Sequence, residues 1–126
     1  MANCCDSLTL ASTGSSVGIT MPVTFTPNKL TFEVGSKSGS TTSSSICLGT
    51  VDSGGYMTYL TTARDNSTST VKNADGTNKC VSIWEWVSGA WTEVMSISFV
   101  SFTSTGFNLN IASVNANYKI KYFAEN

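Results

Sequence analysis

The sequence predicts an all-β domain, an antiparallel β-sandwich of about eight or nine strands. Ser and Thr make up about 30% of the 126 residues, while only 12% are charged. Thr is favoured in strands, and Ser and Asn are favoured in turns. Apolar and polar residues alternate over short runs, which is the period of a strand, and Gly-containing turn signals separate the runs at regular spacing.

The length fits one domain with its own core. We expect a sandwich over residues 17–126, preceded by an N-terminal arm over residues 1–16 with a short strand at 8–11. Pro22 suggests an edge position or a bulge in the strand expected at 17–25. Further strands are expected at 29–34, 46–51 and 56–62.

Two polar segments interrupt these runs. Residues 35–45, GSKSGSTTSSS, are expected to form a hairpin loop. Residues 64–79 are expected to form a second polar excursion around one short strand at 69–72, with Asp75-Gly76 as a tight turn.

The stretch from Cys80 to Ala124 carries four consecutive strand signals. In the first, Trp84 and Trp86 share one face with Cys80 and Ser82, opposite Val81, Ile83, Glu85 and Val87. Ser88-Gly89 predicts a two-residue hairpin, so the chain from Trp91 should return antiparallel. The run 91–102 changes phase, which a bulge near 98–100 or burial of both faces would explain. Residues 107–111 and 118–123 complete the series.

Composition excludes several classes of function. The net charge is −1, with 7 basic and 8 acidic residues scattered singly, so no basic stripe suits nucleic acid. No apolar stretch approaches the roughly 18 residues of a membrane span. The N-terminus has neither a basic segment nor an apolar core, so we expect no cleaved signal peptide and synthesis in a cytoplasm.

Metal and disulfide chemistry find little support. There is no histidine and no CxxC spacing among Cys4, Cys5, Cys47 and Cys80, which argues against zinc. We expect free thiols, with Cys47 and Cys80 as small buried hydrophobes; alternatively, the Cys4-Cys5 pair cross-links neighbouring subunits. Asp65 and Asp75 are candidate calcium ligands, and ordinary turn chemistry is the competing explanation.

Catalysis lacks a constellation of partners. Without histidine there is no Ser-His or Cys-His nucleophile. Glu85 and Glu93 are the most suggestive carboxylate pair for glycoside hydrolysis, because the hairpin could place them on paired strands. The alternative is two solvated strand residues. We expect no enzyme and no cofactor.

Aromatic side chains and the single arginine are the candidate contact residues. Trp84, Trp86 and Trp91 cluster at one hairpin, where they would contact another subunit, fill the sandwich core or stack on a glycan. Arg64 could hold a ligand through two hydrogen bonds, or form a surface ion pair with Asp65 or Asp75.

Two segments carry a family resemblance. The run 101–111, SFTSTGFNLNI, followed by 118–124, YKIKYFA, resembles the end of H-type lectin-like domains, and 25–30, FTPNKL, resembles their early Phe-x-Pro step. Small phage tail and virion-surface proteins share this pattern. The resemblance implies a six- to nine-stranded β-sandwich that forms a trimer or a hexamer of two trimers. It also implies either glycan binding at subunit boundaries or service as a virion appendage.

These observations predict a non-enzymatic structural protein of a bacteriophage virion, either tail-associated or decorating the capsid. Its expected partners are itself, as a trimer or hexamer, and other virion proteins, with host surface glycans as an additional ligand. The stretch from Cys80 to Ala124 holds more apolar residues than one small core needs, which favours another subunit as the partner. The alternative is a free carbohydrate-binding lectin.

Overall fold

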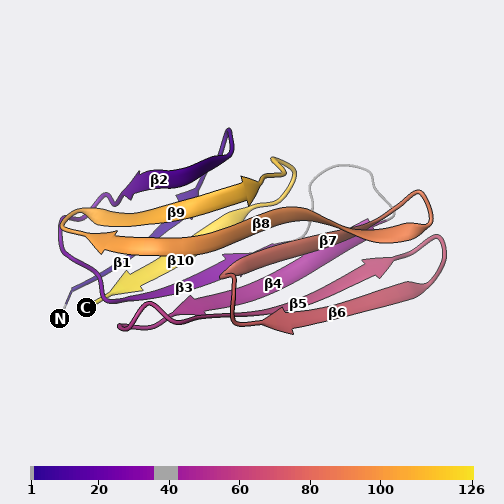
Figure 1. The fold of residues 1–126 in the computed structure, drawn as a ribbon, viewed down its shortest axis with the longest axis horizontal. Helices are drawn as coiled ribbons and strands as arrows, with labels where there is room; N and C mark the ends of the chain where they lie inside the picture. Colours follow the sequence, from indigo (N-terminus) through magenta and orange to yellow (C-terminus); the bar gives the residue numbers. More distant parts are fainter. Residues whose placement is uncertain (1, 36–42) are drawn as a thin grey trace.

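The computed structural model describes residues 2–35 and 43–126, which form two antiparallel sheets packed face to face (Figure 1). One sheet has six strands in the order β1-β10-β3-β4-β5-β6, and the other has four in the order β2-β9-β8-β7. The strands are β1 (Asn3–Leu8), β2 (Gly14–Thr20), β3 (Lys29–Val34), β4 (Ser43–Val51), β5 (Met57–Asp65), β6 (Thr70–Gly76), β7 (Val81–Val87), β8 (Ala90–Thr103), β9 (Gly106–Ser113) and β10 (Ile120–Glu125). The described residues contain no helix, and the predicted antiparallel β-sandwich is confirmed.

The core lies between the sheets and follows the alternation of the strands. In β3, Leu30, Phe32 and Val34 are buried, whereas Lys29 and Glu33 point to solvent. Phe32 meets Phe107 of β9 edge to face with the ring centroids 6.1 Å apart, which joins the two sheets. Burial of such side chains supplies most of the free energy that stabilises a domain of this size.

The open edge of β7 faces the inner side of the six-stranded sheet. Figure 1 shows β7 running beside β4, and β7 packs on both β4 and β5. The Thr61 hydroxyl donates a hydrogen bond of 2.6 Å to the carbonyl of Ser82, and the backbone N–H of Trp86 donates one of 3.1 Å to the Ser43 hydroxyl. These bonds satisfy backbone groups that an edge strand otherwise leaves unpaired.

The hairpin between β7 and β8 forms as expected. Ser88 and Gly89 both have positive φ, 51° and 86°, which is the geometry of a two-residue type I′ turn. The register between β8 and β9 shifts between Phe99 and Ser101, so Val100 is an extra residue. This confirms the bulge expected near 98–100. A second register shift, opposite Ile83 and Trp84 of β7, leaves Val94 as an extra residue.

Several expected boundaries in the N-terminal half are wrong. The first strand is β1 rather than 8–11, and it pairs along its whole length with β10, so this part of the expected arm is a strand of the sheet. The second, β2, is an edge strand as expected, but it ends at Thr20, before Pro22. Of the loop expected at 35–45, residues 43–45 belong to β4, because their pairing with β5 places Ser43 and Ser45 on the buried face. Residues 36–42 lie outside the described residues.

The polar segment 64–79 is also more regular than expected. Its strand, β6, runs from Thr70 to Gly76 and pairs with β5, so Asp75-Gly76 is part of a strand and not a tight turn. The turn lies instead between Asp65 and Thr70. The Asp65 carboxylate stabilises it by accepting hydrogen bonds from the Thr68 N–H at 3.0 Å and from the Ser67 hydroxyl at 2.9 Å.

We expect Gly49→Ala to lower the free energy of unfolding by about 3 kcal/mol, because a Cβ at Gly49 would lie 1.6 Å from the carbonyl oxygen of Cys80. The contact is with backbone, so a side-chain rotation cannot relieve it. Denaturant unfolding of wild type and variant measures the difference. Gly35→Ala is the matched control, since its Cβ would meet nothing nearer than 4.0 Å; equal losses in the two variants would contradict the close approach of β7 to β4.

Candidate functional site

The three expected contact tryptophans lie together on one face of the β7–β8 hairpin. Trp86 of β7 is directly opposite Trp91 of β8, and their rings meet edge to face with centroids 5.5 Å apart. Trp84 lies two residues before Trp86 on the same strand, so its side chain shares this face. All three side chains are partly buried. We call this surface the tryptophan face.

Trp84 is held mainly by contacts within the chain. The Lys72 amine of β6 lies 4.6 Å from the centroid of its ring, which is the distance of a cation–π contact. The indole N–H donates a hydrogen bond of 2.9 Å to the Ser82 hydroxyl. That hydroxyl donates in turn to Glu93 at 2.6 Å. Trp84 therefore joins the hairpin to β6.

Glu85 and Glu93 lie on paired strands but on opposite faces of the hairpin. Glu93 is opposite Trp84, whereas Glu85 is opposite Thr92. Glu93 forms an ion pair with Lys79, with both carboxylate oxygens within 2.8 Å of the amine. The two carboxylates do not converge on one bond of a substrate, so the geometry of a paired-carboxylate glycosidase is not formed here.

The alternative expectation, that Glu85 is a solvated strand residue, is also wrong, because Glu85 is buried. The hydroxyl of Tyr118 donates a hydrogen bond of 2.9 Å to its carboxylate. Burial raises the pKa of Tyr118 well above its ordinary value, and the neighbouring Glu85 carboxylate raises this pKa further. This pair therefore connects the inner face of β7 to the segment before β10.

Arg64 lies on β5, not in a loop, and its side chain is exposed on the outer face of the six-stranded sheet. Asp65 follows it on the strand, so that carboxylate points to the inner face, where it is buried. Asp75 is exposed on the outer face. Asp65 and Asp75 thus lie on opposite faces and cannot bind one calcium ion together. Arg64 takes part in neither of the two ion pairs between described residues, which are Lys29–Glu125 and Lys79–Glu93.

The cysteines are all free thiols. Cys47 and Cys80 are buried as expected, while Cys5 is exposed beside a buried Cys4. Burial raises the pKa of the Cys80 thiol to about 12, and the nearby Cys47 adds to this effect. Within residues 2–35 and 43–126, no group of three or more acidic or cysteine side chains is placed to hold a metal ion. The same residues include no helix of the length and apolar character that crossing a membrane requires.

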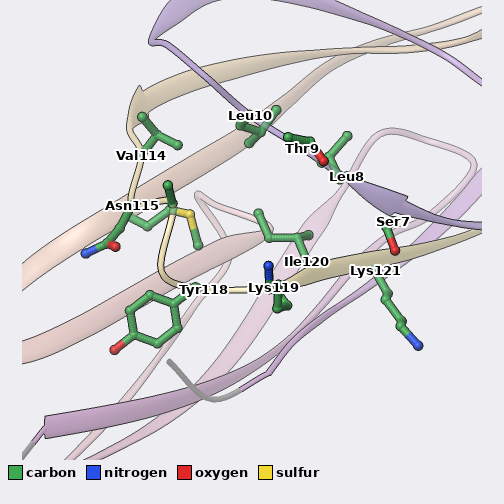
Figure 2. A pocket seen from close by; sticks show the side chains of 12 residues that line it. Ser7, Leu8, Thr9, Leu10, Val114, Asn115, Tyr118, Lys119, Ile120 and Lys121 are labelled. Carbon is green, nitrogen blue, oxygen red and sulfur yellow. The ribbon is translucent and has the colours of Figure 1, made fainter. Parts of the chain in front are cut away.

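A cavity of about 350 Å³ opens beside the segment that joins β9 to β10. Figure 2 shows Leu10 and Val114 on one side of it and Ile120 and Tyr118 on the other. Lys119 and Lys121 also line it. Its lining, drawn wholly from described residues, contains neither a carboxylate nor a tryptophan, so the residues expected to form a site do not contribute to it.

A group of exposed apolar side chains lies on the outer face of the six-stranded sheet. Ile46 and Leu48 of β4 are 63% and 48% exposed, Leu60 of β5 is 62% exposed and Val71 of β6 is 58% exposed. Leu48 is directly opposite Leu60 in the register of the two strands. We call the surface around these four side chains the apolar face. Neighbouring exposed apolar side chains on one sheet face are typical of a surface that another molecule covers.

Charged side chains flank the apolar face on two sides. One row of residues runs across five strands in register: Lys121, Glu33, Leu48, Leu60 and Asp75. A hollow of about 450 Å³ on one side of Leu48 is lined by Lys119, Lys121 and Glu33, and another of about 310 Å³ on its other side is lined by Leu60 and Asp75. The row therefore has a lysine followed by a glutamate at one end, two leucines in the middle and an aspartate at the other end.

Sequence reasoning missed the apolar face and looked for surplus apolar residues only between Cys80 and Ala124. About half of the large apolar residues in that stretch are buried and most of the others are partly buried, whereas Val87, Val100 and Phe123 are exposed. The signal for the apolar face was present in residues 46–51. Ile46 and Leu48 have one parity and Cys47 and Val51 the other, so both faces of this strand are apolar.

Comparisons of this chain with protein-family models, with curated proteins and with solved structures found no match.

Because Cys80 is buried, the free energy of unfolding depends on pH in the alkaline range. The folded thiol keeps its proton up to about pH 12, whereas the unfolded thiol loses it near pH 9.0. Unfolding then releases a proton, so the free energy of unfolding falls as pH rises between these values, by up to about 1.4 kcal/mol per pH unit. We expect Cys80→Ala to be less sensitive to pH over this range. Denaturant unfolding under reducing conditions, from about pH 8 to about pH 11, measures the slopes.

Cys5→Ala is the control, because Cys5 is exposed. Its slope should match that of the wild type. An unchanged slope in Cys80→Ala would contradict the assignment to Cys80, since the buried Tyr118 and Tyr122, whose pKa values burial also raises, would then account for the whole dependence.

Proposed function

We propose that this protein is a non-enzymatic structural β-sandwich that assembles with other protein subunits through the apolar face. The observation that carries the proposal is the exposure of Ile46, Leu48 and Leu60 side by side on one sheet face. Burying such side chains against a partner is favourable by about 1 to 3 kcal/mol each. A largely apolar sheet surface with charged residues at its margin suits another protein better than a small substrate.

The arrangement of the polar side chains supports a role without catalysis. Glu93 is engaged by Lys79 and Ser82, and Glu85 is buried with Tyr118. Such groups stabilise the fold, since each donor or acceptor has a partner within the chain. They do not form a set of acid, base and nucleophile directed at a common point.

We further propose that the assembly is a bacteriophage virion, with the protein either tail-associated or decorating the capsid, and that its fold is of the H-type lectin-like kind. The support is the resemblance of residues 25–30, 101–111 and 118–124 to that family. In the structure these segments contribute to β3, β8, β9 and β10, the centre of the sandwich. Quantitative mass spectrometry of purified particles tests the location: high copy number favours capsid decoration, low copy number favours the tail, and absence from particles contradicts the proposal.

A free carbohydrate-binding lectin is the second candidate, and the partly exposed Trp86–Trp91 pair favours it. An aromatic pair at a hairpin offers a surface on which a sugar ring can stack. We expect a lectin to give glycan-array signals that a Trp86→Ala, Trp91→Ala double variant loses. An array without signals would remove this candidate and leave the structural role.

Replacing Ile46, Leu48 and Leu60 together by Thr should convert the assembled protein into monomers. Thr preserves strand propensity but removes most of the apolar surface, so the change acts on association rather than on folding. Size-exclusion chromatography with light scattering over a range of concentrations measures the mass. The control is Val100→Thr, which removes an exposed apolar side chain from the other sheet. A wild-type protein that stays monomeric at every concentration would contradict the proposed assembly.

A further inference from the structure

We propose that a second copy of this chain packs face to face on the apolar face, related by a twofold axis parallel to β4. This inference rests on the proposed function and specifies its partner and geometry. The axis passes over Leu48, so that Leu48 faces its own equivalent and Lys121 of each copy faces Asp75 of the other.

The register across the sheet fixes the distances from such an axis. In the row through Leu48, Leu60 lies one strand away on one side and Glu33 one strand away on the other. Asp75 and Lys121 lie two strands away, on opposite sides. Since neighbouring strands are about 4.8 Å apart, Lys121 and Asp75 are equally far from β4. A half-turn about β4 therefore exchanges their positions.

Charge then distinguishes a twofold axis parallel to the strands from one that lies in the interface plane perpendicular to them. An axis parallel to β4 brings each Lys121 to an Asp75, which makes two attractive pairs. With an axis in the interface plane perpendicular to the strands, each strand lies over the same strand of the other copy. Lys121 would then face Lys121, and Asp75 would face Asp75. Like charges in an interface oppose association, so the parallel axis is favoured.

Lys121 and Asp75 are free to make these pairs. Both side chains are exposed, and neither takes part in an ion pair within the described part of the chain. Glu33 would face Leu60 of the second copy while remaining opposite Lys121 on the neighbouring strand of its own sheet. Lys121 would thus lie between two carboxylates, one from each copy.

The rows on either side are also compatible with this axis. Ile46 would face its own equivalent, which buries two of the most exposed apolar side chains against each other. In the row through Thr50, Thr31 and Thr58 lie on either side of β4 and would face each other across the interface. These two rows add apolar and hydroxyl contacts, and neither places like charges together around the axis. Packed sheets cross at about 30°, so the axis bisects two slightly crossed β4 strands.

The test is a charge exchange in the full-length chain. Lys121→Glu alone and Asp75→Lys alone each replace two attractive pairs by two repulsive ones, so we expect self-association weaker by about tenfold or more. A mixture of the two single variants should recover association. In a mixed pair, the Glu introduced at position 121 of one chain faces the Lys introduced at position 75 of the other. The second contact of that pair is a native one between Lys121 and Asp75. The double variant should also recover it. Sedimentation equilibrium gives the dissociation constants, and native mass spectrometry counts each chain in the complex.

Asp6→Lys is the matched control, since it changes the net charge as Asp75→Lys does, on an exposed residue of β1 whose side chain is not on the outer face. It should associate as the wild type does. Twofold pairing gives complexes with an even number of chains, a dimer or a hexamer of two trimers, with equal numbers of the two variants in the mixture.

Three results overturn the inference while leaving the proposed function in place: association unaffected by either single variant, a complex of three chains only, and stronger pairing of Lys121→Glu with wild type than of wild type with itself. The last would indicate the perpendicular axis. A wild-type chain that never associates is a different outcome, because it removes the proposed assembly and this geometry together.

Discussion

The fold depends on the close contact between the open edge of β7 and the inner faces of β4 and β5. Gly49 allows this approach, because any side chain there would overlap the carbonyl of Cys80. Thr61 and Ser43 then provide the hydrogen-bonding groups that the edge of β7 needs. The four-stranded sheet is thereby fixed along one side of the six-stranded sheet. The burial of Val81 and Ile83, and the meeting of Glu85 with Tyr118, follow from this placement.

This contact also explains the role of the tryptophan face. With its edge directed at β4 and β5, β7 turns one face to the core and the other toward β6. Trp84 meets Lys72 there, so part of the aromatic surface that was expected to contact a ligand is used within the chain. The apolar face has no such internal partner among the described residues. The surface most suited to a second molecule is therefore on the other side of the six-stranded sheet from the core.

The class of fold could be predicted from the sequence because alternation along a strand is a local property. Leu30, Phe32 and Val34 identify their strand without reference to any other segment, and Ser88-Gly89 identifies its turn. The same turn pairs Glu85 with Thr92 and Glu93 with Trp84, so the opposite faces of the two carboxylates follow from it. The extra residue Val94, which lets Met95 share the core face with Ile83, could not be predicted, because it depends on the register between strands. Likewise, Ser43 and Ser45 look like loop residues until their pairing with β5 is known.

Lys72 has a consequence beyond its contact with Trp84. β6 is the outermost strand of its sheet, so its unpaired backbone groups could accept a strand from another molecule. Repeated addition of this kind would extend the sheet indefinitely. Its inward-facing amine is stabilised by an aromatic ring of its own chain, and an added strand would press against that charge and desolvate it. A charge placed in this way keeps a sheet from growing sideways into fibres. At this edge of the sheet, Lys72 therefore disfavours the addition of a further strand beside β6.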